Sequence, residues 1–165
     1  MTQTLSRHIG ALRSADREER RAAAEALAGL GSEARGAAVA LVAASCDADE
    51  SVRQWSSSAL EDLGPPCQQD QQPLIRLLDD RRADVAYWAA TLLGRLGDRA
   101  TDAVDALALT VMASPFPAVR QRAAWALGHI GPPAAAATPA LTCASRSDNT
   151  RLSRLAARAL ASIRG

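Results

Sequence analysis

Side chains that commonly carry out chemistry are few in this 165-residue chain. It has two histidines and three cysteines, and Cys46, Cys67 and Cys143 show neither C-x-x-C spacing nor neighbouring histidines. Metal sites and disulfide frameworks need such clusters. No nucleophile elbow, phosphate-binding loop or H-E-x-x-H motif is present in the sequence. We therefore expect no catalytic residue, no metal and no cofactor, and the sequence leans against an enzyme without excluding one.

The odd number of cysteines predicts reduced thiols in a cytoplasmic protein. Cys67 follows Pro65 and Pro66 in a predicted turn, and a reactive thiol there is the less favoured interpretation. The first residues lack the apolar run of a secretory signal. The longest uncharged stretch, residues 123–145, is interrupted by glycines and prolines, so we expect no membrane-spanning segment.

Aromatic side chains are the remaining candidates for a functional site. The chain has five of them: Trp55, Tyr87, Trp88, Phe116 and Trp125. By contrast, it has 38 alanines, and all 19 of its basic residues are arginines. A composition rich in Ala and Leu favours closely packed helices over sheets. The role of each aromatic residue therefore depends on the helix, and the helix face, that carries it.

An internal repeat defines these helices. One leucine, which we call the anchor leucine, recurs at intervals of 33 or 34 residues, and a small residue stands four positions before it. The anchor leucines are Leu27, Leu60, Leu93, Leu127 and Leu160. The small residues are Ala23, Ser56, Ala89, Ala123 and Ala156. A period of this length is typical of stacked helical repeats.

Each repeat predicts two helices. The second, which we call the anchor helix, has apolar or small residues at offsets −8, −4, −1, 0 and +3 from the anchor leucine, which is one stripe at helical period. A glycine at offset +4 suits a left-handed C-cap in four repeats, at Gly31, Gly64, Gly97 and Gly131. Aspartates and an asparagine in the turn before the anchor helix suit N-capping. We expect a single all-α domain, an α-solenoid of five helical hairpins with about ten helices, with repeats at 2–31, 34–64, 67–97, 100–131 and 134–165.

The clearest copy of the repeat carries a family resemblance. Its matching residues are Val119, Arg120, Ala123, Ala124, Ala126, Leu127, Gly128, Ile130 and Gly131. Asp49, Val52 and Arg53 repeat the beginning of this pattern. It resembles HEAT repeats, in particular the short bacterial type also found in phycobilisome lyases, over essentially the whole chain. The resemblance implies that the anchor helices line a concave groove, and that Glu19 and Arg164, which depart from the pattern, belong to end caps.

Positions outside the packing stripe differ between repeats, and they hold all three tryptophans and the tyrosine. Aromatic and arginine side chains are favoured in binding hot spots. Trp55 and Trp88 leave two interpretations equally open, because they could bind a ligand or stack on each other between repeats. For Trp125 with His129 a ligand-facing role is favoured. The predicted groove residues are Trp55, Tyr87, Trp88, Thr91, Arg95, Arg122, Trp125, His129, Arg154 and Arg158.

Three arginines occupy the same position of the repeat, seven residues before an anchor leucine. They are Arg20, Arg53 and Arg120. These side chains could form a basic ladder for phosphate. The favoured interpretation is structural, with each arginine paired to a turn carboxylate of the kind provided by Asp16, Asp47 or Asp49.

Charge is distributed unevenly along the chain, although the net charge is only +1. Residues 47–80 carry a net −6 and residues 146–165 a net +4. Solvated faces of opposite sign explain this, as would head-to-tail self-association. The sharper hypothesis is an anionic ligand or an acidic partner segment near Arg122, Arg154 and Arg158.

The sequence therefore predicts a scaffold or adaptor that binds a protein or peptide in its groove, without chemistry. The alternative is a small-molecule-binding protein with lyase- or isomerase-like activity, similar to phycobilin lyases, with Trp88, Trp125 and His129 around the ligand. Nucleic-acid binding is the weaker alternative, because the total charge is balanced and lysine is absent.

Overall fold

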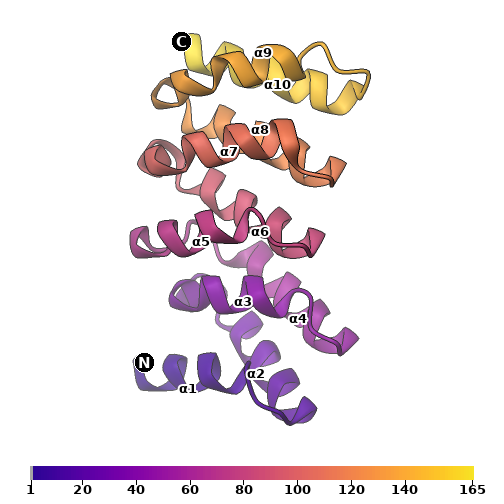
Figure 1. The fold of residues 1–165 in the computed structure, drawn as a ribbon. Coiled ribbons are helices and arrows are strands. Elements are labelled where there is room, and N and C mark those ends of the chain that lie inside the picture. Colours follow the sequence, from indigo (N-terminus) through magenta and orange to yellow (C-terminus); the bar gives the residue numbers. More distant parts are fainter. Residues whose placement is uncertain (1) are drawn as a thin grey trace. The chain divides into compact units, whose positions relative to one another are not determined.

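The computed structural model describes residues 2–165, and over this range the chain forms ten α-helices, four 3-10 helices and no strand (Figure 1). The α-helices are α1 (Thr2–Ala11), α2 (Arg17–Gly29), α3 (Ala38–Ala44), α4 (Glu50–Asp62), α5 (Gln71–Leu77), α6 (Ala83–Arg95), α7 (Val104–Ala113), α8 (Pro117–Ile130), α9 (Thr138–Ala144) and α10 (Thr150–Arg164). The 3-10 helices are Gly31–Ala37, Gln68–Asp70, Gly97–Ala103 and Pro132–Ala137. Consecutive α-helices pair into five hairpins. The predicted all-α fold of five hairpins and about ten helices is confirmed.

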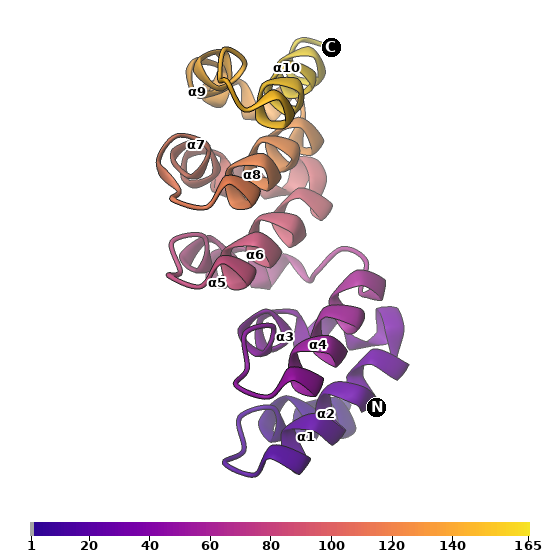
Figure 2. The ribbon, with the colours of Figure 1, turned by 90° about the vertical axis from the view of Figure 1, so that its right-hand side faces the viewer.

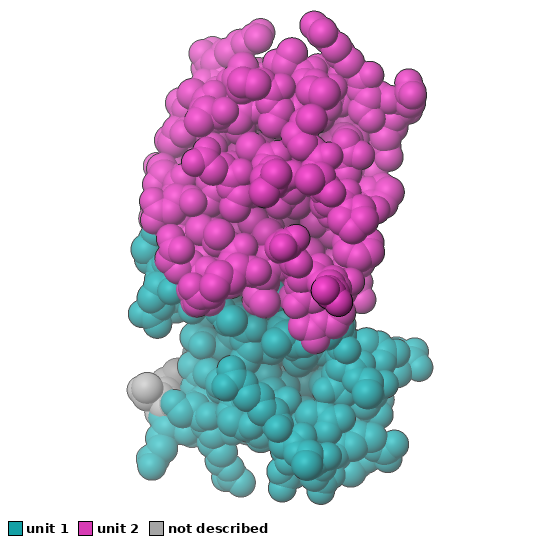
Figure 3. All heavy atoms as spheres, in the orientation of Figure 1, with its two compact units in different colours: residues 1–70 teal, residues 71–165 magenta. Residues whose placement is uncertain are grey.

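The chain divides into two compact units, residues 1–70 (unit 1) and 71–165 (unit 2) (Figure 3). Unit 1 contains α1 to α4, and unit 2 contains α5 to α10. Within each unit the odd-numbered helices form one layer and the even-numbered anchor helices another (Figure 2). The boundary lies inside the third predicted repeat, just before α5. The single domain expected for the whole chain stays a prediction.

The core consists of the stripe that the repeat defines. All five small residues at offset −4 are buried, and so are the anchor leucines from Leu27 to Leu160. The leucines that the first helices of repeats two to five contribute are completely buried; they are Leu41, Leu74, Leu107 and Leu141. Glu19, which replaces the apolar residue at offset −8 in the first repeat, is exposed. Burial of this stripe between neighbouring hairpins is the main source of stability.

The ends of the anchor helices follow the expected chemistry. The four glycines at offset +4 all have a positive φ, between 50° and 73°. This conformation is strained for residues with a Cβ, so the glycine allows the chain to leave the helix sharply. At the other end, Asp16, Asp49 and Asn149 accept hydrogen bonds from backbone N–H groups of α2, α4 and α10. The glycine prediction is confirmed in all four repeats, and the capping prediction for α2, α4 and α10, whereas the N-cap of α6 is Arg82 and makes no side-chain cap bond.

The 3-10 segments after these glycines were not predicted. Three of them bury an alanine seven positions after the anchor leucine: Ala34, Ala100 and Ala134. The repeat with Cys67 at this position has only the short 3-10 helix Gln68–Asp70. Cys67 is half-buried, and not in an exposed turn as expected. Its backbone N–H donates to Asp70, and burial raises the pKa of that carboxyl group against the effect of the hydrogen bond.

Small residues allow the anchor helices of unit 2 to approach closely. A Cβ atom on Gly94 would lie 2.9 Å from Cα of Ala126, and one on Gly128 would lie 3.1 Å from Cα of Ala159. The backbones of α6, α8 and α10 therefore pack against one another at these glycines, since any side chain there would push them apart. The larger side chains of the same helices lie beside the contact points, where they form the candidate site.

Candidate binding site

The arginines at offset −7 form hydrogen bonds within the array of repeats itself. Arg20 donates to both carboxylate oxygens of Asp47, at 2.8 and 3.0 Å. Arg53 instead donates to the backbone carbonyls of Asp47 and Ala48, and Arg120 donates to the carbonyl of Val111. The predicted pairing with a turn carboxylate is confirmed for Arg20 and is wrong for Arg53 and Arg120, which bond to backbone carbonyls instead. Burial acts against ionisation of Asp47, but its bonds with Arg20 and with the Asp49 N–H hold its pKa below the usual value.

An aromatic and basic cluster lies on α6 and α8. The guanidinium carbon of Arg122 is 4.5 Å from the ring centroid of Tyr87 and 4.9 Å from that of Trp125. Arg122 also donates a hydrogen bond to the Tyr87 hydroxyl. The edge of Trp88 packs on Tyr87, with 5.8 Å between centroids and an interplanar angle of 85°. The contacts with both rings hold the charge of Arg122 in one place, because a cation is attracted to an aromatic face.

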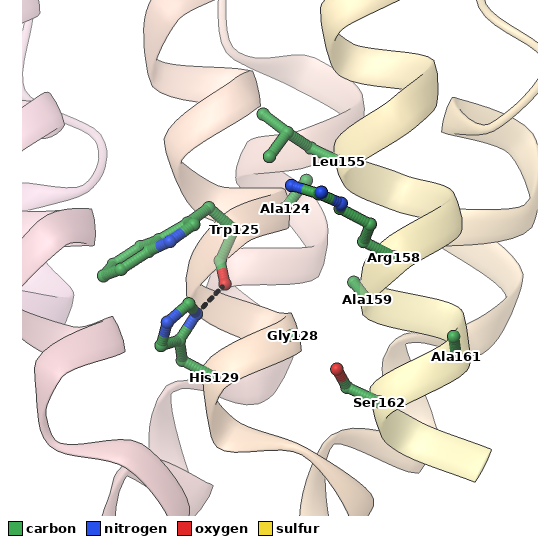
Figure 4. A pocket seen from close by; sticks show the side chains of 9 residues that line it. All are labelled: Ala124, Trp125, Gly128, His129, Leu155, Arg158, Ala159, Ala161 and Ser162. Atoms are coloured by element: carbon green, nitrogen blue, oxygen red, sulfur yellow. Dashed lines mark hydrogen bonds between the residues drawn. The ribbon is translucent and has the colours of Figure 1, made fainter. Parts of the chain in front are cut away.

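Trp125 contacts neighbours on α6 and on its own helix. Its ring packs over Gly94 of α6, where a Cβ atom would collide with it. The centroid of the His129 ring lies 4.0 Å from that of Trp125, and the two rings are tilted by 37°. His129 Nδ1 is 3.0 Å from the backbone carbonyl of Trp125 (Figure 4). Since a carbonyl only accepts, Nδ1 carries the proton, and in neutral His129 Nε2 is the free acceptor.

A groove runs between α8 and α10 beside this cluster. Its larger part is an open hollow of about 610 Å³. This part is lined by Ala124, Trp125, Gly128, His129, Leu155, Arg158, Ala159, Ala161 and Ser162 (Figure 4). A second hollow of about 310 Å³ is lined by Tyr87, Ala118, Gln121, Arg122, Trp125, Arg151 and Leu155. Trp125 and Leu155 line both hollows, so these two side chains form an apolar wall that the two compartments share. We call the two hollows together the α8–α10 groove.

The charge of the α8–α10 groove is positive. Helices α8 and α10 contain six arginines and no acidic residue. Arg122 and Arg151 line one compartment and Arg158 the other, while Arg154 is exposed on α10. Within residues 2–165 none of these four arginines takes part in an ion pair. The α8–α10 groove therefore presents positive charge that the unit itself does not neutralise.

The predicted site residues are brought together in part. Tyr87, Arg122, Trp125, His129 and Arg158 line the α8–α10 groove, and Trp88 supports Tyr87 from the side. Arg95 is half-buried in the last turn of α6 and lines neither hollow.

Two predicted residues lie elsewhere. Thr91 was expected to face a ligand, but it is buried, and its hydroxyl donates to the carbonyl of Tyr87. A threonine hydroxyl in a helix can satisfy itself in this way, which allows burial. Trp55 belongs to α4 of unit 1 and is 38% exposed.

Leu155, Arg151 and Gln121 line the groove but were not among the predicted site residues. Leu155 shares its repeat position with Trp55, Trp88 and Arg122, so the variable column did contain a signal for it. Arg151 lies in the first turn of α10, outside the positions that vary around the anchor leucine. Its place in the groove follows from the packing of α10 against α8.

Neither a metal cluster nor a membrane-spanning helix is found among the described residues. Among residues 2–165, no cluster of three or more His, Cys, Asp or Glu side chains is arranged to hold a metal ion. Over the same residues, no helix combines the length and the apolar character needed to cross a bilayer.

Comparison with known proteins identifies the class of repeat. The family model for HEAT repeats matches residues 71–161, which is more than half of the chain. The protein therefore belongs to the HEAT-repeat family. A search of curated proteins finds no match to the chain.

Solved structures share the fold. An engineered protein from the Northeast Structural Genomics Consortium is 24% identical, with 99% of this chain and 80% of that chain covered and a TM-score of 0.65. A designed armadillo repeat protein in complex with the peptide (KR)4 is 22% identical, with coverages of 96% and 81% and a TM-score of 0.66. The complex of CpcE and CpcF of phycocyanin lyase from Nostoc sp. PCC7120 is 26% identical, with a TM-score of 0.67. That match covers 96% of this chain and 64% of the other.

Proposed function

We propose that this protein is a binding scaffold whose α8–α10 groove takes up an acidic peptide segment of a partner protein. Arg122 is the observation on which the proposal depends. Its side chain is fixed by the Tyr87 hydroxyl and by two aromatic rings, and it has no carboxylate partner within residues 2–165. A guanidinium held in this way has lost its rotamer freedom before binding, so an arriving carboxylate gains more of the interaction energy.

The apolar wall adds a second element of recognition. Trp125 and Leu155 separate the compartment of Arg122 and Arg151 from the compartment of Arg158 and His129. A peptide side chain that packs on this wall would have positive charge on both sides. We therefore expect the preferred segment to have an aliphatic or aromatic residue flanked by acidic residues in both directions.

The related structures support this class of function. Repeat proteins of the same fold include one that binds the basic peptide (KR)4. The charge of the α8–α10 groove has the opposite sign to what such a peptide needs, because α8 and α10 contain arginines and no acid. An acidic segment is the complementary ligand.

Anisotropy titrations with fluorescein-labelled peptides test the proposal. The probe is a short peptide with a central leucine between glutamates, compared with the same peptide in which glutamine replaces glutamate. We expect saturable binding of the first peptide only, weakened about tenfold by Arg122→Met because a charge-assisted hydrogen bond is lost. Arg76→Met is the matched control, since Arg76 is an exposed arginine on α5 that lines neither hollow. Equal affinity of both peptides, or equal loss in both variants, would refute the proposal.

A small anionic ligand is the second candidate. The larger hollow, at about 610 Å³, has the volume of typical small-molecule sites. One structural neighbour is a phycocyanin lyase complex, which keeps lyase- or isomerase-like activity within this alternative. Mass spectrometry of metabolites and proteins that co-purify with the chain separates the two candidates. A bound metabolite that is lost in Trp125→Ala, with no protein partner, would favour the small molecule. Nucleic acid remains the weaker alternative, and a labelled single-stranded oligonucleotide in the same titration tests it.

A further inference from the structure

The turns before the anchor helices share a hydrogen bond that aligns the five repeats. At offset −13 from each anchor leucine, a side-chain oxygen accepts from the backbone N–H two residues later. The accepting residues are Ser14, Asp47, Asp80, Ser114 and Ser147. Because this bond recurs in all five turns, residues at this position can be compared between repeats as structural equivalents.

In unit 1 this position completes an ion pair between neighbouring repeats. Arg20, at offset −7 of the first repeat, binds Asp47, at offset −13 of the second. The two side chains are only 16% and 13% exposed. The guanidinium donates two hydrogen bonds to the carboxylate, and this bidentate geometry is the strongest for such a pair.

In unit 2 the same two positions, one repeat apart, are Arg120 and Ser147. A serine hydroxyl carries no charge, so the carboxylate is missing from this copy of the pair. Arg120 uses Nε to reach the carbonyl of Val111, at 2.7 Å. Its two terminal nitrogens make no hydrogen bond within residues 2–165. Unit 2 thus keeps the arginine and lacks its counter-charge.

A hollow lies at this place. Arg120, Arg146 and Ser147 line an open space of about 580 Å³, together with Met112, which is 44% exposed. No acidic residue lines it, and Asp148, which follows Ser147 in the chain, is not among its lining residues. None of the lining residues belongs to the α8–α10 groove. Two arginines therefore line an open hollow at the position where the second repeat, in unit 1, places the Asp47 carboxylate.

We propose that this hollow is a second anion site, in which a carboxylate from an acidic side chain of a partner protein takes the position that Asp47 occupies in unit 1. Arg120 and Arg146 supply the positive charge, and the exposed side chain of Met112 offers an apolar contact for the neighbouring part of the partner. The partner would provide the carboxylate that the second repeat has at this position and the fifth repeat does not.

A substitution that introduces a carboxylate into the site provides the most direct test. Ser147→Asp places a carboxylate at the position equivalent to Asp47, so it should raise the melting temperature and exclude an external carboxylate. The increase should disappear when Ser147→Asp is combined with Arg120→Met, because the new carboxylate then has no partner. Ser114→Asp is the matched control, since Ser114 makes the same turn hydrogen bond but does not line this hollow.

Binding is followed by NMR on the arginine Nε–H signals of the 15N-labelled full chain, titrated with a short glutamate-rich peptide and, separately, with inorganic phosphate. We expect the peptide to shift the signal of Arg120 saturably, and Ser147→Asp to weaken this binding by about tenfold. The Arg122→Met variant separates the two surfaces: persistence of the Arg120 shifts in it would confirm a site distinct from the α8–α10 groove. Absence of a saturable shift, identical binding to Ser147→Asp, loss of the Arg120 shifts in Arg122→Met, or tighter binding of phosphate than of peptide would overturn the proposal.

Discussion

The two units are built from the same repeat and differ in how they treat charge. Unit 1 has seven arginines against eleven acidic residues, a net of −4, while unit 2 has twelve against seven, a net of +5. In unit 1, Arg17, Arg20 and Arg21 each lie beside a carboxylate. In unit 2, the arginines of α8 and α10 form no ion pair among the described residues. These unit 1 arginines are neutralised within the chain, whereas those of α8 and α10 in unit 2 keep a charge that no carboxylate among the described residues neutralises.

The aromatic residues follow the same division. Unit 1 has one tryptophan, Trp55, which is 38% exposed. Unit 2 has Tyr87, Trp88 and Trp125, which are half-buried and contact one another or Arg122. A rigid aromatic surface next to unneutralised arginines is a favourable place for binding, because little ordering remains to be done when the ligand arrives. The binding function that we propose would therefore lie in unit 2, and four experiments test the contrast between the units.

The largest effect is expected from removing a core residue next to the site. Leu127→Ala should lower the free energy of unfolding by about 2–5 kcal/mol, since Leu127 is fully buried. Trp125→Ala should cost less than about 1.5 kcal/mol, because a surface-facing ring loses fewer contacts. Urea denaturation of both variants gives the comparison. A loss of about 3 kcal/mol or more for Trp125→Ala would place that ring in the core and contradict its assignment to the groove.

The glycines of the anchor helices should respond in opposite ways in the two units. Gly94→Ala in unit 2 should destabilise by about 1–3 kcal/mol and weaken peptide binding, because its Cβ would meet Trp125 and Ala126. Gly29→Ala in unit 1 should be neutral or stabilising by about 0.5–1 kcal/mol, because nothing lies within 4 Å of the added Cβ. Thermal melts and the anisotropy titration measure both effects. Unchanged peptide binding by Gly94→Ala would show that binding does not require the packing of Trp125 against α6.

The buried position at offset −4 holds a serine in one repeat of unit 1 and an alanine in unit 2. Opposite substitutions at this position should therefore have opposite effects on stability. Ser56 in unit 1 is completely buried, and its hydroxyl has no hydrogen-bond partner within the described residues. Ser56→Ala should stabilise by about 1 kcal/mol, because the cost of burying an unpaired hydroxyl disappears. The reverse change at the equivalent position of unit 2, Ala123→Ser, should destabilise by a similar amount. Equal stability of wild type and Ser56→Ala would show that the hydroxyl is already satisfied.

The smallest effect concerns acid stability. The pKa of Asp47 is lowered in the folded state by its bond with Arg20, so protons bind the unfolded chain first as the pH falls. The stabilisation is fully present above the ordinary aspartate value of about 3.9 and is lost as the pH falls through the lower folded value. Asp47→Asn should therefore flatten the acid limb of a stability-versus-pH curve. An unchanged acid limb would show that the pair contributes nothing to the pH dependence.

Several features of the site could be predicted from single residues. The placement of Tyr87, Trp88 and Trp125 outside the packing stripe followed from the repeat, and so did the positive φ of the glycines at offset +4. Thr91 was misplaced because its sequence column does not reveal that its hydroxyl bonds to the preceding turn of its own helix. Arg151 was missed because its place in the groove exists only where α10 crosses α8, whereas Leu155 stood in a variable position that the sequence did show.

The sequence alone determined the repeat, the ten helices and their buried stripe, because helical periodicity and glycine conformation are local properties that survive without knowledge of the packing. The uneven charge of the chain was also visible in the sequence. Only the tertiary structure decided which arginines are neutralised. Arg20 and Arg120 occupy the same sequence column, and their difference depends on what the next repeat places opposite them, an aspartate in one unit and a serine in the other. The second anion site that we propose rests on that difference, because charge acts through space and not along the chain.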